Sequence, residues 1–188
     1  MKRILVLSVL AILIASVSYG QMAYKKGDQA ASAMFGLGFS HSLSGTATTV
    51  PPLSAAFDYG YNENISIGGI IGYESEKYES SSFGYGYKFT YSYLIIAARG
   101  AYHVDLLHNA NIDTYGGVLL GYDVASSSAE YTGNWAGLLG IQPSAESVGG
   151  AVFGVFAGGR YYFNRNLAVQ LEVGYGLSYL NIGIAYKL

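Results

Sequence analysis

The histidines are the first residues to consider for chemistry, because the chain has only three of them and no cysteine. Ser40 and Ser42 flank His41, and a serine beside a histidine can act as a nucleophile in acyl transfer. Such a site also needs an acidic partner for the histidine, and none is evident in this stretch. We therefore expect no catalytic residue and no enzyme activity.

The other two histidines, His103 and His108, are separated by Val-Asp-Leu-Leu, which is the wrong spacing for paired metal ligands on a helix. The absence of cysteine excludes disulfides and thiolate metal sites. We expect both histidines in a turn, and we expect neither a metal site nor a cofactor.

Charged residues offer a different chemistry, because four of them are predicted to point into the interior of the protein. The simplest interpretation is an ion-pair network that fills the interior and satisfies buried charges. The alternative is a narrow polar path gated by the same pairs. We expect a direct ion pair between Arg160 and Glu172, whose strands are joined by a tight turn at Arg165. The four residues are Asp58, Arg99, Arg160 and Glu172.

The elements that position these charges are clearest in the last 22 residues, LAVQLEVGYGLSYLNIGIAYKL. Large apolar residues, Leu177 among them, alternate there with small or polar ones. Successive side chains of a strand point to opposite faces, so this pattern predicts two strands joined by a tight turn. The second face carries glycine, alanine and single charges rather than the polar residues of a soluble sandwich. This pattern is typical of a small membrane barrel, in which the large apolar residues face outward and the small or polar ones fill the interior.

The start of the chain predicts export. Lys2 and Arg3 precede an apolar run at 4–15, and the small residues Ser18 and Gly20 follow it. The run is shorter than the ~20 residues of a spanning helix. We therefore predict a signal peptide at 1–20 and one domain at 21–188. No later segment is long and apolar enough to span as a helix, which favours a closed barrel for an exported apolar chain.

The composition agrees with a membrane location. Charged residues make up 12% of the chain, against ~25% in soluble domains. Removal of Lys2 and Arg3 leaves 8 basic and 12 acidic residues, a net charge of −4. This balance offers no basic patch, so we expect no nucleic-acid partner.

The alternation predicts eight strands, at 33–42, 53–61, 65–74, 90–103, 112–125, 149–163, 167–177 and 180–188. Connections are short after the second, fourth and sixth strands and long after the first, third and fifth. We therefore predict an all-β, antiparallel up-and-down transmembrane barrel in the bacterial outer membrane, monomeric unless its loops pair, with both termini periplasmic. Outward aromatic residues form two predicted girdles: Tyr59, Tyr61, Tyr102, Tyr161, Phe163 and Tyr186 at the periplasmic end, and Phe39, Tyr73, Tyr122 and Tyr175 at the external end.

Several segments resemble the small eight-stranded outer-membrane β-barrel proteins, and most closely the outer membrane beta-barrel domain proteins of Bacteroidota. These segments are ARGAYH (98–103), DTYGGVLLGY (113–122), GGRYYFNRNLAVQLEVGYG (158–176) and the terminal YLNIGIAYKL, and the resemblance covers essentially the whole mature chain. It implies outer-membrane lipid, periplasmic chaperones and the barrel-insertion machinery as partners. The insertion signal would be Ile182, Ile184, Tyr186 and Leu188, where the family usually ends in Phe.

The predicted external loops are the remaining candidates for binding. Segment 75–88 combines aromatic residues with serine and glycine, a composition typical of adaptable recognition surfaces. The alternative is that the flanking strands extend into this segment and its residues only lengthen the hairpin above the membrane. Two functions stay open: a non-catalytic structural or surface-binding barrel with an unidentified extracellular ligand, and a small porin-like channel for ions or solutes. The possible loop contacts are Tyr78, Phe83, Tyr85 and Tyr87, with Trp135 in the longest loop at 126–148.

Overall fold

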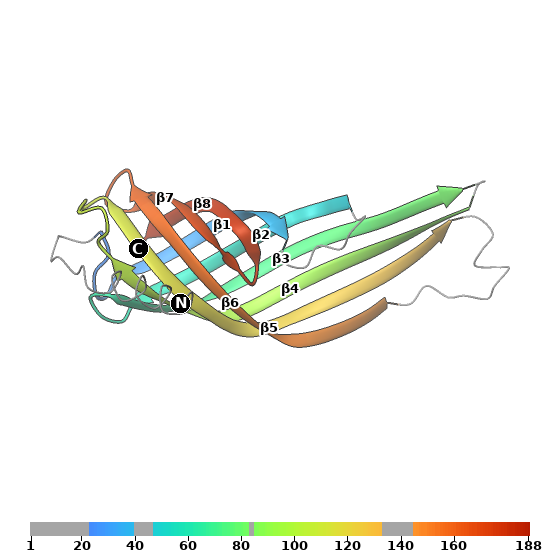
Figure 1. Cartoon of the computed structure of the whole chain (residues 1–188), viewed down its shortest axis with the longest axis horizontal. Helices are drawn as coiled ribbons and strands as arrows, with labels where there is room; N and C mark the ends of the chain where they lie inside the picture. Colours follow the sequence, from blue (N-terminus) through green and yellow to red (C-terminus); the bar gives the residue numbers. More distant parts are fainter. Residues whose placement is uncertain (1–22, 40–46, 83–84, 133–144) are drawn as a thin grey trace, which may run out of the picture.

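Eight antiparallel strands close into a barrel in the computed structural model, which describes residues 23–39, 47–82, 85–132 and 145–188. Each strand pairs with the next, and β8 pairs with β1, so the predicted fold is confirmed (Figure 1). Within the described residues there is no helix with the length and apolar character needed to cross a membrane. The strands are β1 (Gln29–Phe39), β2 (Ala47–Gly60), β3 (Ile65–Ser82), β4 (Tyr85–Val104), β5 (Ile112–Thr132), β6 (Ala145–Tyr162), β7 (Leu167–Tyr175) and β8 (Ser178–Lys187).

The two faces of each strand differ in the way that the alternation predicts. In β7, the outward residues Leu171 and Val173 are 49% and 51% exposed, whereas the inward Gln170 and Glu172 are almost fully buried. Large apolar side chains therefore cover the outside, and polar and small side chains fill the lumen. An eight-stranded barrel has an interior just wide enough to be filled by side chains, and this lumen is filled in that way.

An apolar cluster occupies part of the lumen and includes one residue that was predicted to face outward. Leu177 is buried in this cluster, so its predicted position is wrong. Gly176, at a φ of +126°, and Leu177 connect β7 to β8, and this turn interrupts the alternation. The cluster is Met34, Ala56, Ile70, Ile95, Ala97, Leu119, Val152 and Leu177.

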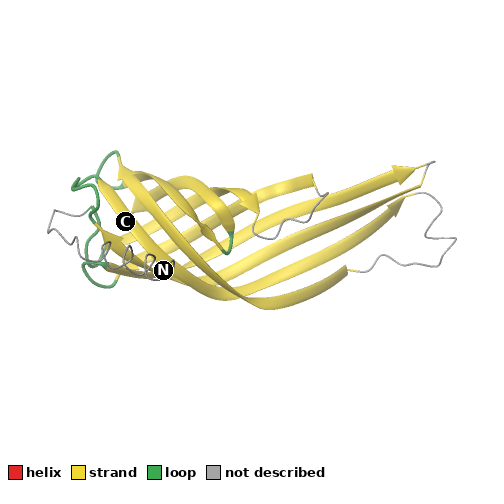
Figure 2. Ribbon diagram, in the orientation of Figure 1, coloured by secondary structure: helices red, strands yellow, loops and turns green. Residues whose placement is uncertain are grey.

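One end of the barrel, called the turn end here, carries the three short connections β2–β3, β4–β5 and β6–β7 (Figure 2). Two of them are closed by an asparagine. The Asn62 Oδ1 atom accepts hydrogen bonds from the backbone N–H groups of Asn64 and Ile65, and Asn164 does the same in the β6–β7 turn. These side-chain caps are the turn chemistry that asparagine provides.

At the other end, four strands run far beyond the closed barrel (Figure 1). β3 to β6 have 18 to 21 residues each, whereas β7 and β8 have 9 and 10. The β3–β4 ladder is continuous up to Ser82 and Tyr85. Most of segment 75–88, predicted as a loop into which strand could extend, therefore belongs to the strands: β3 continues to Ser82 and β4 begins at Tyr85. We call residues 74–82, 85–94, 123–132 and 145–153 the extended sheet.

Candidate functional site

The lumen brings the four predicted interior charges together, each at most 4% exposed. Arg160 Nη2 lies 2.5 Å from Asp58 Oδ2, and Arg99 Nε lies 3.2 Å from Asp58 Oδ1. Arg99 Nη2 lies 2.7 Å from Glu172 Oε1. Asp58 therefore joins two guanidinium groups that come from β4 and β6, and Arg99 reaches across to β7.

The predicted direct ion pair between Arg160 and Glu172 is wrong. The β6–β7 register places Arg160 opposite Gln170, and it places Glu172 opposite Gly158. Gln170 bridges the two charges instead: its Oε1 accepts from Arg160 Nε at 2.8 Å, and its Nε2 donates to Glu172 Oε1 at 2.8 Å. Both charges were assigned to the correct face, but they lie two residues apart along the ladder.

A second set of polar side chains, centred on His103, continues this network. His103 Nδ1 lies 2.7 Å from Asp113 Oδ1, and His103 Nε2 lies 2.9 Å from Ser66 Oγ. Asp113 Oδ2 is 3.9 Å from Arg160 Nη1, which joins the two sets. The prediction that His103 lies in a turn is wrong, because β4 continues to Val104 and directs His103 into the lumen. We call all these residues, with Tyr115, the interior network.

The order serine, histidine, aspartate is that of a catalytic triad, but here it is enclosed. Ser66 and His103 are each 1% exposed, so no substrate reaches the hydroxyl in this conformation. With its proton on Nδ1, His103 donates to Asp113 and accepts from Ser66, so each of the three side chains has a hydrogen-bond partner. The arrangement therefore completes the buried network.

The charges of the interior network are close to balance. Arg99 and Arg160 face Asp58, Asp113 and Glu172, so the formal sum is −1 with His103 neutral. Glu172 Oε1 also accepts a hydrogen bond from the Tyr115 hydroxyl at 2.8 Å. Buried charges are tolerated when they are paired and hydrogen-bonded in this way.

The first described residues, 23–28, close the lumen at the turn end. The Tyr24 ring stacks on His103 with 3.7 Å between centroids, and its hydroxyl donates to the Ile65 carbonyl at 2.8 Å. Burial and the nearby Asp113 raise the pKa of Tyr24, so this hydroxyl stays a donor. Lys187 Nζ binds the Ala23 carbonyl and, at 2.7 Å, Asp28 Oδ2. We call residues 23–28 the N-terminal latch.

The remaining predicted residues lie outside the lumen. Tyr78 and Tyr87 are 37% and 39% exposed on the extended sheet, with ring centroids 6.0 Å apart. Phe83, Trp135 and the side chain of Tyr85 lie outside the described residues, as do Ser40, His41 and Ser42. The four residues of the predicted insertion signal share the outer face of the C-terminal strand and its end: Ile182, Ile184, Tyr186 and Leu188.

The extended sheet carries more acidic than basic residues. Its only cations among the described residues are Lys77 and Lys88, each 3.3 Å from a glutamate on the same face, Glu79 and Glu130. Its acidic residues are Glu74, Glu76, Glu79, Asp123, Glu130 and Glu146. The described part of the chain contains no group of three or more histidine, aspartate or glutamate side chains that could hold a metal ion.

Comparisons with known proteins identify the fold. No protein-family model matches the chain, and neither does any curated protein. Ail, the attachment invasion locus protein of Yersinia pestis, solved in complex with the heparin analogue sucrose octasulfate, matches with a TM-score of 0.56 at 14% identity over 87% of this chain and 99% of Ail. The outer membrane protein OprG from Pseudomonas aeruginosa matches with a TM-score of 0.51 at 15% identity over 89% of this chain and 99% of OprG. The chain therefore has the fold of small outer-membrane β-barrels.

Proposed function

We propose that this protein is a non-catalytic outer-membrane barrel that binds a partner through its extended sheet, with the turn end and both termini in the periplasm. The outer face supports the membrane location, because large apolar side chains cover it and exposed aromatic residues lie at both ends of the barrel wall. Tyr61 and Phe163 at the turn end are 62% and 65% exposed, and Tyr122 and Tyr175 toward the other end are 54% and 53% exposed. Aromatic side chains favour the two membrane–water interfaces, so these two groups are expected where the barrel wall meets water on each side of the membrane.

The filled lumen favours binding over conduction. Arg99, Arg160 and Asp58 form one barrier across the interior, and Tyr24 covers His103 as a second barrier at the turn end. A conducting path needs a continuous line of water, and these groups bind one another instead. The porin-like alternative is therefore the less favoured function.

The observation that carries the proposal is the open edge of β6 in the extended sheet. The β6–β7 ladder ends at Val155 and Tyr175, so residues 145–154 have no strand on that side among the described residues. An open strand edge presents backbone donors and acceptors in the arrangement that an added strand requires. The exposed Tyr78 and Tyr87 add aromatic contact area on the same sheet.

The charge of the extended sheet indicates the chemistry of the partner. Four of the six acidic residues, Glu79, Asp123, Glu130 and Glu146, are at least partly exposed, against two lysines. This excess of negative charge repels a polyanion such as the sulfated heparin analogue that was solved with Ail. It attracts a basic segment instead. We therefore expect an extended, lysine- or arginine-rich strand of another protein to pair with β6.

A peptide-binding experiment on the folded, full-length mature protein in lipid nanodiscs tests this proposal. The probes are two labelled peptides of equal length, one alternating Lys and Thr and the other alternating Glu and Thr, measured by fluorescence anisotropy. We expect the Lys–Thr peptide alone to bind, with an affinity that falls as salt is added. Glu146→Lys on the open edge should weaken this binding, whereas Glu63→Lys, the same change in the β2–β3 turn, should not.

Two results would contradict the proposal. One is that the two peptides bind equally well at low salt, or that neither binds, and that Glu146→Lys and Glu63→Lys both behave as wild type does. The other is a steady single-channel current from the wild-type protein in planar bilayers, which would favour the channel.

A further inference from the structure

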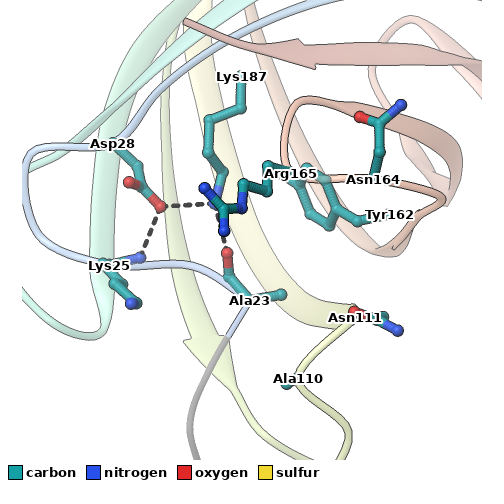
Figure 3. Close-up of a pocket in the computed structure, with 9 residues that line it drawn as sticks. All are labelled: Ala23, Lys25, Asp28, Ala110, Asn111, Tyr162, Asn164, Arg165 and Lys187. Carbon is teal, nitrogen blue, oxygen red and sulfur yellow. Dashed lines mark hydrogen bonds and ion pairs between the residues drawn. The ribbon is translucent and has the colours of Figure 1, made fainter.

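A cavity at the turn end, separate from the interior network, gathers cationic side chains. Its volume is about 550 Å³, within the ~300–1,000 Å³ of ligand sites. Four parts of the chain line it: the N-terminal latch, the β4–β5 turn, the end of β6 with the β6–β7 turn, and the end of β8 (Figure 3). The residues that matter for its chemistry are Lys25, Asp28, Asn111, Arg165 and Lys187.

The cavity has a formal charge of +2, from Lys25, Arg165 and Lys187 against Asp28. Asp28 Oδ2 is already engaged by Lys187 Nζ at 2.7 Å and by the backbone N–H of Lys25 at 2.9 Å. Neither the Lys25 ammonium nor the Arg165 guanidinium has a hydrogen bond or ion pair with any other described residue. As far as the described residues go, two of the three cations are therefore available to bind an anion.

Lys187 is held in place and still has one donor to offer. Its Nζ atom donates to Asp28 and to the Ala23 carbonyl, and it lies 4.8 Å from the centroid of the Tyr162 ring. An ammonium has three N–H donors, so one remains. Because the existing contacts fix this group, a ligand would meet an ordered cation rather than a flexible one.

We propose that this cavity binds a phosphate group of headgroup size, with Arg165, Lys25 and Lys187 as its ligands and the Asn111 amide as a further donor. Arginine and lysine are the side chains that recognise phosphate, and arginine does so with two parallel hydrogen bonds. A phosphate diester or monoester would offset the charge of +2 and would reduce the repulsion among the three cations.

The surroundings of the cavity suit a phospholipid as the source of the phosphate. Two apolar residues adjoin the lining residues in the sequence: Phe163 precedes Asn164 and Arg165, and Leu188 follows Lys187. Both apolar side chains are more than 60% exposed on the outer face. Acyl chains beside Phe163 and Leu188 would leave the headgroup at the level of the cavity. The assignment to the periplasmic leaflet rests on the orientation given under the proposed function, whereas the phosphate chemistry does not.

The test uses the folded full-length mature protein in an uncharged maltoside detergent, titrated with three phosphate compounds. These are dihexanoylphosphatidylglycerol, dihexanoylphosphatidylcholine and glycerol phosphate, followed by calorimetry and by the backbone amide NMR signals of Asn111 and Lys25. We expect phosphatidylglycerol to bind more tightly than phosphatidylcholine, whose choline adds a positive charge. Arg165→Gln and Lys25→Gln should each weaken binding about tenfold, as expected for a hydrogen bond between charged groups.

The matched control is Lys77→Gln on the extended sheet, which should leave the affinity unchanged. Heat-modifiable migration on a gel verifies that every variant is folded. Tighter binding of phosphatidylglycerol than of glycerol phosphate assigns the site to a lipid, and equal binding assigns it to a free phosphate ester. If none of the three compounds shifts the Asn111 and Lys25 signals, the proposal is overturned. It is also overturned if the variant that carries both Arg165→Gln and Lys25→Gln binds as tightly as wild type. Failure of the peptide test at the extended sheet would leave this result unaffected.

Discussion

Replacement of Arg99 and of Glu172, singly and together, tests how the interior network is connected. Arg99 joins Asp58 and Glu172, and its guanidinium carbon lies 4.2 Å from the centroid of the Phe156 ring. In Arg99→Met, Arg160 alone would face three carboxylates, so the formal charge of the network would change from −1 to −2. In Glu172→Gln the charge would become zero, and the amide oxygen could still accept from Tyr115 and Gln170.

These differences set the expected magnitudes. Loss of one partner of a buried ion pair lowers the free energy of unfolding by about 3 to 5 kcal/mol. We expect Arg99→Met at the upper end of this range and Glu172→Gln at the lower end. Because the two residues contact each other, the double variant should lose about 1 to 3 kcal/mol less than the sum of the single changes.

The assay is urea unfolding and refolding in lipid vesicles, monitored by heat-modifiable migration. A parallel cycle with Arg160→Met and Glu172→Gln should give a coupling smaller by at least ~1 kcal/mol, because Gln170 separates these two charges. The control pair, Lys88→Met with Glu130→Gln on the surface, should couple by less than ~1 kcal/mol. A larger coupling for Arg160 with Glu172 than for Arg99 with Glu172 would refute the contacts described here.

Three further predictions concern glycine packing, the N-terminal latch and conduction. Gly68→Ala should lower the free energy of unfolding by about 1 to 3 kcal/mol or more, because the added methyl group would overlap the Phe57 carbonyl. In Gly69→Ala the atom nearest to the new methyl group would lie at 3.6 Å. This change should alter the free energy of unfolding by less than ~1 kcal/mol in the same urea assay. Equal effects of the two changes would contradict the packing described for Gly68. Tyr24→Ala should speed hydrogen exchange at the Gly27 and Gly60 amides at least about tenfold but leave β7 unchanged, since only the latch contacts are lost. Planar bilayers should stay silent for both wild type and Tyr24→Ala, because the barrier formed by Arg99, Asp58 and Arg160 remains; steady openings in the variant would show that the latch alone blocks the lumen.

The strand period explains why the fold and the interior charges could be predicted from the sequence. Side chains two residues apart share a face, so placing the apolar residues outward also places Asp58, Arg99, Arg160 and Glu172 inward. The period does not give the partner of each charge. The Arg160–Asp58 contact spans 102 residues and the Arg99–Glu172 contact spans 73, and both depend on how far the strands are staggered around the barrel.

Other parts of the site escaped prediction for local reasons. His103 is one residue from the end of β4. Sequence patterns locate the end of a strand only to within a few residues, so they do not decide whether His103 belongs to the strand or to the turn. Tyr24 stands alone among polar residues and follows no period. The alternation of Tyr87, Phe89, Tyr91 and Tyr93 did signal a strand, since aromatic residues favour strands, but the surrounding serine and glycine were interpreted as a loop.

The N-terminal latch has a consequence for the order in which the molecule assembles. Its partners are Gly60, Ile65, His103 and Lys187, and the contact between Ala23 and Lys187 joins residues 164 positions apart. The complete set of partners exists only after β8 has paired with β1, and contacts between distant residues form slowly. The latch therefore docks after the barrel has closed, as the last step of folding. A chain arrested before that step would leave Tyr24 and the His103 side of the lumen open to water.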